Sequence, residues 1–143
     1  MTSFNGFEEI VRQAEPLAMH TWYQIGGPAE YFAEPRTPDE LHKLIVRCHE
    51  EGVPVRLLGS GSNLLVRDEG VPGMVIRLSS PEFEKLEMKD NTIRVSSGVK
   101  LGRVVTTAVH AGLAGIESLI GIPGTLGGAL HGNAGTNSTD IGQ

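Results

Sequence analysis

The clearest alternation of apolar and polar positions lies between Thr37 and Gly52. Thr37 and Pro38 match the cap and the first position of a helix, and Glu40 places an acid three residues after the cap. Apolar residues then recur at helical spacing, namely Leu41, Leu44, Ile45 and Cys48. Gly52 stands where helices often take a left-handed residue at their end. The pattern predicts an amphipathic helix that ends at Gly52.

Short apolar runs bounded by turn residues follow this helix and predict a β-rich middle of the chain. The runs cover residues 53–58, 64–66 and 74–78, and residues 83–95 are typical of a hairpin that turns at residues 89–91. Because Gly59-Ser60-Gly61-Ser62-Asn63 lies between the first two runs, we expect a glycine loop that joins two strands.

A second helical pattern is followed by a change of composition. Its apolar positions are Leu101, Val104, Val105, Ala108 and Val109, and Gly112 predicts its end. The segment Gly121-Ile122-Pro123-Gly124-Thr125-Leu126-Gly127-Gly128-Ala129 then carries little side-chain bulk, so we expect its backbone to lie close against another group.

Three arginines alternate with the apolar residues of the predicted strands. They are Arg56, Arg67 and Arg77, and we expect them on the solvent face of those strands. His20 precedes the predicted helix, and two roles stay open for it: a structural hydrogen bond, or a contact with a nucleotide cofactor.

Composition narrows the class of protein. A length of 143 residues suffices for one sizeable core, and 19 glycines without a collagen-like period indicate tight backbone approaches. The formal charge of −5 and the lack of a basic stripe argue against a nucleic-acid partner.

The cysteine count and the apolar runs bear on compartment and membrane. Cys48 is the single cysteine, so no internal disulfide is possible, and no metal site is predicted from its neighbours. Residues 1–10 carry acids without an apolar run, and no stretch of eighteen apolar residues occurs. We therefore expect a cytoplasmic protein with no membrane partner.

The glycine loop at residues 59–63 has the composition of an anion-binding nest. Small residues let successive backbone N–H groups converge, and Ser and Asn side chains add donors. The loop lacks the lysine of a P-loop and the third, helix-opening glycine of a dinucleotide fingerprint. A pyrophosphate site and a simple tight turn both stay open for it.

Two interpretations also stay open for the second glycine segment. Its bulk-free backbone suits a flat ligand, but small residues in a helix packed closely against a neighbour would give the same composition.

Three motifs together carry a family resemblance. They are residues 20–30 (His20-Thr21-Trp22-Tyr23-Gln24-Ile25-Gly26-Gly27-Pro28-Ala29-Glu30), residues 59–63, and residues 121–133 followed by Ala134-Gly135. In this order they resemble UDP-N-acetylenolpyruvoylglucosamine reductase, also called UDP-N-acetylmuramate dehydrogenase, the MurB family. The resemblance implies an α+β FAD-binding domain of the vanillyl-alcohol oxidase and p-cresol methylhydroxylase type. Chain 1–143 would then be an incomplete domain of two small subdomains, at about 18–78 and 79–143, without the C-terminal substrate-binding domain.

The resemblance also implies a cofactor site. Residues expected to hold the FAD pyrophosphate are Gly59, Ser60, Gly61, Ser62, Asn63 and Leu64. Residues expected to line the flavin are Gly98, Gly121, Ile122, Pro123, Gly124, Gly127, Gly128 and Asn133. The loop has no histidine where covalent relatives attach FAD, so we expect non-covalent, dissociable FAD.

The family transfers hydride from NADPH to FAD and then to the enolpyruvyl group of a UDP-sugar, which yields UDP-N-acetylmuramate for peptidoglycan. Its arginine, its serine or cysteine proton donor and its glutamate lie downstream of residue 143, so we assign no catalytic residue and expect this chain alone to be inactive. Unpaired strand edges would favour self-association.

Two other functions stay open. One is a flavin oxidase or dehydrogenase of the same fold with a different substrate, which the downstream sequence would distinguish. The other is a short non-catalytic nucleotide-binding module, which a stop codon directly after Gln143 would support.

Overall fold

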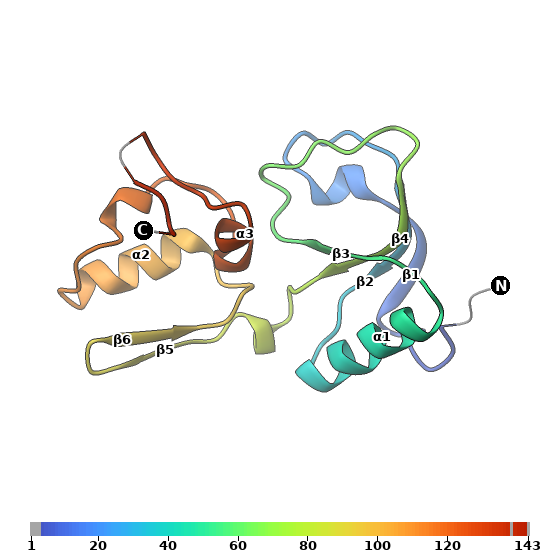
Figure 1. Ribbon diagram of the computed structural model, residues 1–143, viewed down its shortest axis with the longest axis horizontal. Helices are drawn as coiled ribbons and strands as arrows, with labels where there is room; N and C mark the ends of the chain where they lie inside the picture. The colour runs from blue at the N-terminus through green and yellow to red at the C-terminus, as the bar shows by residue number, and fades with distance from the viewer. Residues whose placement is uncertain (1–3, 138, 143) are drawn as a thin grey trace. The chain divides into compact units, whose positions relative to one another are not determined.

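The chain forms two compact units in a computed structural model that describes residues 4–137 and 139–142. The N-terminal unit is Met1–Ser80 and the C-terminal unit is Pro81–Gln143 (Figure 1). Residues 1–3, 138 and 143, which the expected ranges 1–143 and 79–143 include, lie outside the described residues. The N-terminal unit has two buried apolar clusters and the C-terminal unit has one among the described residues.

The N-terminal unit is built on a mixed four-stranded sheet with the order β1-β2-β4-β3. The strands are β1 (Val11–Pro16), β2 (Pro28–Ala33), β3 (Val55–Leu58) and β4 (Val71–Arg77). β1 runs antiparallel to β2, whereas β4 runs parallel to both β2 and β3. The parallel strands β3 and β4 therefore present their carboxyl ends at the same edge of the sheet.

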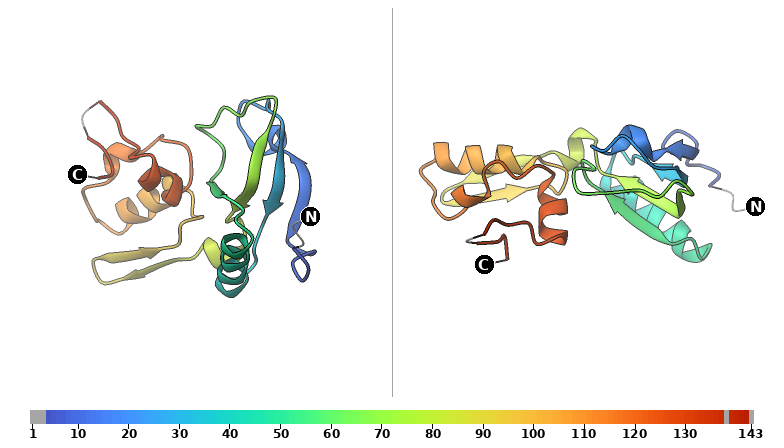
Figure 2. Two further views of the ribbon diagram at one scale, coloured as in Figure 1. Left: turned by 45° about the vertical axis from the view of Figure 1, so that its right-hand side comes forward. Right: turned by 90° about the horizontal axis from the view of Figure 1, so that it is seen from above.

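Both faces of this sheet are covered. The helix α1 (Pro38–Glu50) and the short 3-10 helix η1 (Leu17–His20) lie on opposite faces (Figure 2). The core on the α1 face contains Tyr31, Ala33, Leu44, Cys48, Met74 and Ile76. The core on the η1 face contains Leu17, Ala29, Phe32, Leu58 and Val75. Successive residues of a strand point to opposite faces, so β4 contributes to both cores.

The predicted first helix is confirmed at both ends. Thr37 accepts a hydrogen bond from the Glu40 N–H at 3.1 Å, and Gly52 has a φ of +66°. Leu44 and Cys48 are buried as expected, and burial raises the pKa of the Cys48 thiol. Ile45 is 42% exposed, contrary to expectation, because it lies about 100° around the helix from Leu44, at the edge of the apolar face.

The strand predicted at residues 64–66 is wrong. Residues 59–70 cross from β3 to β4 without forming a strand, and β4 begins at Val71. The place beside β3 is taken by β4, so this segment bonds to another loop instead, with Arg67 O accepting from the Gly27 N–H at 2.8 Å. Leu65 in this segment is 72% exposed.

The C-terminal unit combines a hairpin with short helices. The predicted hairpin is confirmed as β5 (Leu86–Lys89) paired antiparallel with β6 (Thr92–Val95). The second predicted helix is confirmed as α2 (Leu101–His110), although Val109 is exposed rather than packed. The remaining elements are the 3-10 helices η2 (Pro81–Phe83) and η3 (Glu117–Leu119) and the helix α3 (Leu126–His131).

Within residues 4–137 and 139–142, every helix is too short or too polar to cross a bilayer. Among the same residues, no group of three or more His, Cys, Asp or Glu side chains lies together as a metal site would require.

We predict that Thr37→Ala lowers the free energy of unfolding by about 1 kcal/mol, because the Glu40 N–H loses its acceptor at the start of α1. Urea unfolding followed by circular dichroism measures this change. Thr106→Ala, the same replacement at an exposed position inside α2, is the control and should not lower stability, since alanine favours the helix interior. An equal loss in both variants would contradict the capping role.

Candidate functional site

The loop predicted to bind pyrophosphate follows β3 directly, at the carboxyl ends of the neighbouring parallel strands β3 and β4 (Figure 1). We call residues 59–64 the 59–64 loop. Gly61 is buried, the flanking residues Ser60 and Ser62 are half-buried, and Asn63 is exposed. The carboxyl ends of parallel strands are a common position for ligand-binding loops.

Gly61 is required for close packing of the loop on the segment before it. Its φ is +68°, and an added Cβ would overlap the carbonyl oxygen of His20. The Trp22 N–H donates to Gly61 O at 3.1 Å, which fixes the two backbones against each other. Only glycine combines this φ with the space that is left.

Glycines of the 20–30 motif and of the facing segment also allow close packing of the two backbones. An added Cβ on Gly27 would overlap Asp68 O, and one on Gly70 would overlap Pro28 O. Segments 20–28 and 61–70 therefore lie backbone against backbone along their length. The sequence analysis found this motif only as part of the resemblance, because its partner segment is about 40 residues away in the chain.

The 59–64 loop contains N–H and hydroxyl groups that could donate hydrogen bonds to an anion. Among described residues, the N–H groups of Gly59, Ser60, Gly61 and Asn63 enter none of the backbone hydrogen bonds outside helices and strands. Ser60 Oγ is buried and has no hydrogen-bond partner within that described part of the chain. Buried polar groups normally have partners, so these groups fit a ligand rich in acceptor oxygens, such as a pyrophosphate.

A hollow of about 430 Å³ lies beside this loop in the N-terminal unit. The residues on both sides of the loop line it, with Leu57 and Leu58 from β3 and Leu65 and Val66 from the following segment. Its size and its largely apolar side chains are typical of small-molecule sites.

The second glycine segment lies in the C-terminal unit. Its backbone runs beside residues 97–101: Ser97 O accepts from Gly127 N–H at 2.9 Å, and Val99 O from Leu126 N–H at 2.8 Å. The fold therefore brings Gly98, which is buried, next to this segment. Gly127 packs closely, because an added Cβ would lie 2.8 Å from Ser97 Cβ. Close packing against Ser97 therefore accounts for a glycine at this position, and a ligand contact of its backbone stays a prediction.

The other residues of this predicted flavin wall are more open. Gly121 has a φ of +82° and nothing within 4 Å of an added Cβ. Gly128 donates its N–H to the Thr125 hydroxyl at 3.2 Å, at the start of α3. Asn133, two residues after α3, is exposed with a φ of +45°. Ile122 is half-buried and Pro123 exposed, and Gly124 has a φ of +127°.

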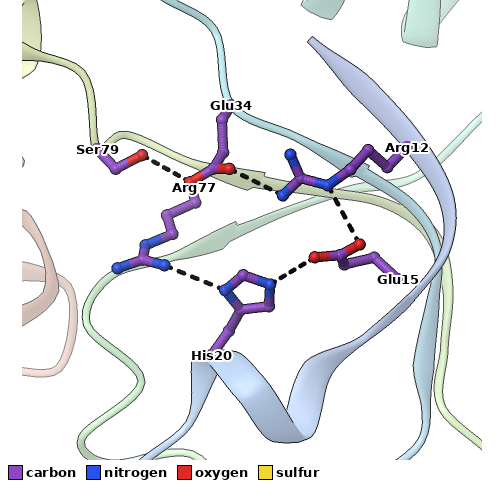
Figure 3. Close-up of polar contacts among 6 residues, drawn as sticks. All are labelled: Arg12, Glu15, His20, Glu34, Arg77 and Ser79. Atoms are coloured by element: carbon purple, nitrogen blue, oxygen red, sulfur yellow. Dashed lines mark hydrogen bonds and ion pairs between the residues drawn. The ribbon is translucent and has the colours of Figure 1, made fainter.

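Sequence reasoning missed a polar network around His20, which Figure 3 shows. His20 Nε2 lies 2.9 Å from Glu15 Oε1, and Arg77 Nη1 lies 3.1 Å from His20 Nδ1. The imidazole also stacks on Phe32, with ring centroids 4.4 Å apart. His20 is thus held on three sides by protein groups, as a structural histidine is.

Arg77 does not lie on a solvent face, contrary to expectation. It is half-buried, because β4 lies between β2 and β3 and both faces of the sheet are covered. Arg56 and Arg67 are exposed as expected, but Arg67 belongs to the 59–70 crossing and not to a strand.

Two further residues belong to this polar network: Arg12, which lies in β1, and Ser79, which follows β4. Arg12 donates to Glu34 Oε2 at 2.8 Å and pairs with Glu15 at 3.1 Å, and Ser79 donates to Glu34 Oε1 at 2.8 Å. The hydrogen bond with His20, followed by that from Arg12, lowers the pKa of Glu15. Burial acts to raise the pKa of Glu34, but the bonds from Arg12 and Ser79 outweigh it, and this pKa is also lowered.

Comparison with known proteins identifies similar sequences and folds. A family model described as FAD binding domain matches residues 29–142. UDP-N-acetylenolpyruvoylglucosamine reductase of Rhodopirellula baltica is 42% identical over 134 residues, which is 94% of this chain and 44% of that protein. The reductase of Paramagnetospirillum magneticum is 48% identical over 126 residues, 88% of this chain and 40% of that protein. The chain therefore spans less than half the length of these relatives.

Solved structures agree with this result. The crystal structure of the Thermus caldophilus reductase has a TM-score of 0.73 and 40% identity, over 91% of this chain and 45% of that one. Cholesterol oxidase from B. sterolicum has a TM-score of 0.65 at 17% identity, over 94% of this chain and 26% of that one, which shows the fold alone. The predicted resemblance and the predicted fold class are both confirmed.

We predict that Gly61→Ala destabilises the N-terminal unit far more than Gly52→Ala, although both glycines have nearly the same positive φ. Gly52 has nothing within 4 Å of an added Cβ, so its replacement should cost only the left-handed conformation, roughly 1–2 kcal/mol. At Gly61 the methyl group would also displace the backbone of His20. Thermal unfolding of both variants measures the difference, and equal midpoints would refute the packing role.

We predict that stability falls as pH decreases below 4.5, the ordinary pKa of glutamate. The pKa of Glu15 is lowered in the folded state, so its contribution is complete above the unfolded value and disappears as pH falls through the folded value. Glu15→Gln should flatten part of this dependence below about pH 4.5, with Glu34 supplying the rest. Glu87→Gln, at an exposed position of β5, is the control, and parallel curves for all three proteins would contradict the role of Glu15.

Proposed function

The chain belongs to the FAD binding domain family, and on this premise we propose that it is the flavin-binding portion of a UDP-N-acetylenolpyruvoylglucosamine reductase. One observation carries the proposal: the likeness to the Thermus caldophilus reductase holds in sequence and in structure together. The complete enzyme would use NADPH to convert the enolpyruvyl UDP-sugar to UDP-N-acetylmuramate for peptidoglycan, in the cytoplasm.

The N-terminal unit would hold the pyrophosphate of FAD. The backbone N–H groups of the 59–64 loop are suited to its oxygens, and Ser60 Oγ, buried and without a partner among described residues, supports the same role. Because the donors are mainly backbone groups, this site depends on the small residues Gly59 and Gly61 more than on side-chain chemistry.

The C-terminal unit would provide the wall for the flavin. Residues proposed for it are Gly98, Gly121, Ile122, Pro123, Gly124, Gly127, Gly128 and Asn133. Bound FAD supplies hydride transfer, which protein side chains do not perform. Orientation of the ring and exclusion of water are the tasks left to these residues, and no residue of this chain is proposed as a proton donor.

The alternative of an oxidase with another substrate has less support. The cholesterol oxidases share the fold at 17–21% identity, so they carry no statement about substrate. The reductases share the fold and about twice that identity.

We predict that the purified chain retains dissociable FAD and does not oxidise NADPH in the presence of the UDP-sugar. Visible absorbance after removal of free flavin measures retention, and release of FAD on denaturation shows that it is not covalent. A chain without flavin whose full-length gene product does bind it would mean that later residues complete the site. Absence of flavin from both proteins would refute the proposal.

A matched pair of variants tests the loop itself. Asn63→Asp places a carboxylate beside the pyrophosphate, so we expect FAD affinity to fall about tenfold or more through charge repulsion. Asn91→Asp makes the same change in the exposed turn between β5 and β6 and should leave affinity unchanged.

A further inference from the structure

Arg77 lies at the same end of the sheet as the 59–64 loop. It is the last residue of β4, and the parallel register pairs it with Leu58, the last residue of β3. Gly59 follows Leu58 directly. The cation and the first residue of the loop therefore leave neighbouring strands at the same level.

The guanidinium of Arg77 has donors to spare. Its Nη1 lies 3.1 Å from His20 Nδ1, and among described residues it forms no ion pair within 4 Å. A guanidinium has five N–H donors and no acceptor, so the contact with one imidazole nitrogen leaves most of them open to an anion.

The carboxylates nearby are held by other groups. Glu34 accepts from Arg12 and Ser79, and Glu15 accepts from Arg12 and His20 (Figure 3). Arg77 acts on Glu34 only through its charge, as the last contribution to the lowered pKa of that carboxyl. A half-buried cation without a bonded carboxylate is typical of a residue that binds a ligand anion.

His20 connects this cation to the loop. Its side chain contacts Arg77, and its backbone carbonyl lies against Gly61, where no Cβ fits. Stacking on Phe32 and the bond with Glu15 fix the imidazole ring of His20. The orientation of the Arg77 guanidinium and the position of the 59–64 loop therefore both depend on His20.

We propose that Arg77 is a phosphate-binding residue of the 59–64 loop and that His20 is the positioning residue that orients it. The proposal rests on the proposed FAD function, and it adds a charged side chain to a site otherwise built from backbone donors and the Ser60 hydroxyl. Arginine suits this role because its planar fork pairs with two phosphate oxygens at once.

The test compares ligands with and without the pyrophosphate. Titration calorimetry of the 143-residue chain with FAD, ADP and adenosine gives the dissociation constants. Arg77→Gln should weaken FAD and ADP at least tenfold, leave adenosine unchanged, and reduce the salt dependence of ADP binding, because a charge contact is lost. Arg77→Lys should restore part of the affinity as a point charge. Arg47→Gln, on α1 across the sheet, is the matched control and should bind like the wild type.

His20 is tested by its hydrogen bonds. His20→Gln keeps an acceptor for Arg77 and a donor for Glu15, whereas His20→Leu keeps only the apolar contact with Phe32. We expect His20→Leu to reproduce the selective loss of ADP affinity and His20→Gln to recover most of it, with circular dichroism confirming that each variant is folded.

The results that would overturn the role of Arg77 differ from those that would overturn the proposed function. Unchanged ADP affinity in Arg77→Gln, or an equal loss for ADP and adenosine, overturns the role of Arg77 even if the chain retains FAD. If the wild-type chain binds neither FAD nor ADP, the proposed function fails for this chain alone, and the same variants in the full-length gene product then decide the role of Arg77 by the same comparison.

Discussion

The structure of the candidate site depends on a contact between two backbones. Gly61 lies against the carbonyl of His20, Gly27 against Asp68 and Gly70 against Pro28. These contacts leave no room for a Cβ, and the bonds Trp22 N–H to Gly61 O and Gly27 N–H to Arg67 O fix their register. We call this contact between segments 20–28 and 61–70 the backbone seam. Without it the 59–64 loop would have no rigid support, because the loop belongs to no strand or helix.

The backbone seam also explains why the loop and a charged network lie at the same end of the sheet, the carboxyl end of β3 and β4. β3 and β4 are parallel, so their carboxyl ends meet, and the crossing between them must return over the η1 face. Segment 20–28 continues from η1, which packs on that face through Leu17, and the His20 side chain at its start contacts Arg77 on β4. One residue, His20, therefore takes part both in the contact that supports the loop and in the charged network.

The sequence predicted the features whose signals are local. The cap at Thr37, the end of α1 at Gly52 and the hairpin turn at Asp90 each depend on residues within a few positions. The strand expected at 64–66 failed because an apolar triplet does not reveal whether a neighbouring strand is free to pair. Arg77 was misplaced for a related reason: alternation along a strand cannot tell whether the outward face is covered by another segment. The donor-rich character of the 59–64 loop was visible in its composition, whereas the role of Gly27 required knowledge of a partner 40 residues away.

A site built from backbone groups places few demands on side-chain identity. A loop that binds through N–H groups demands small residues at a few positions and the correct path of the chain, and little else. The likeness to the cholesterol oxidase from B. sterolicum, at 17% identity, concerns the fold alone. In the N-terminal unit, Arg77 with its supporting His20 would add a fixed charge that backbone donors do not provide.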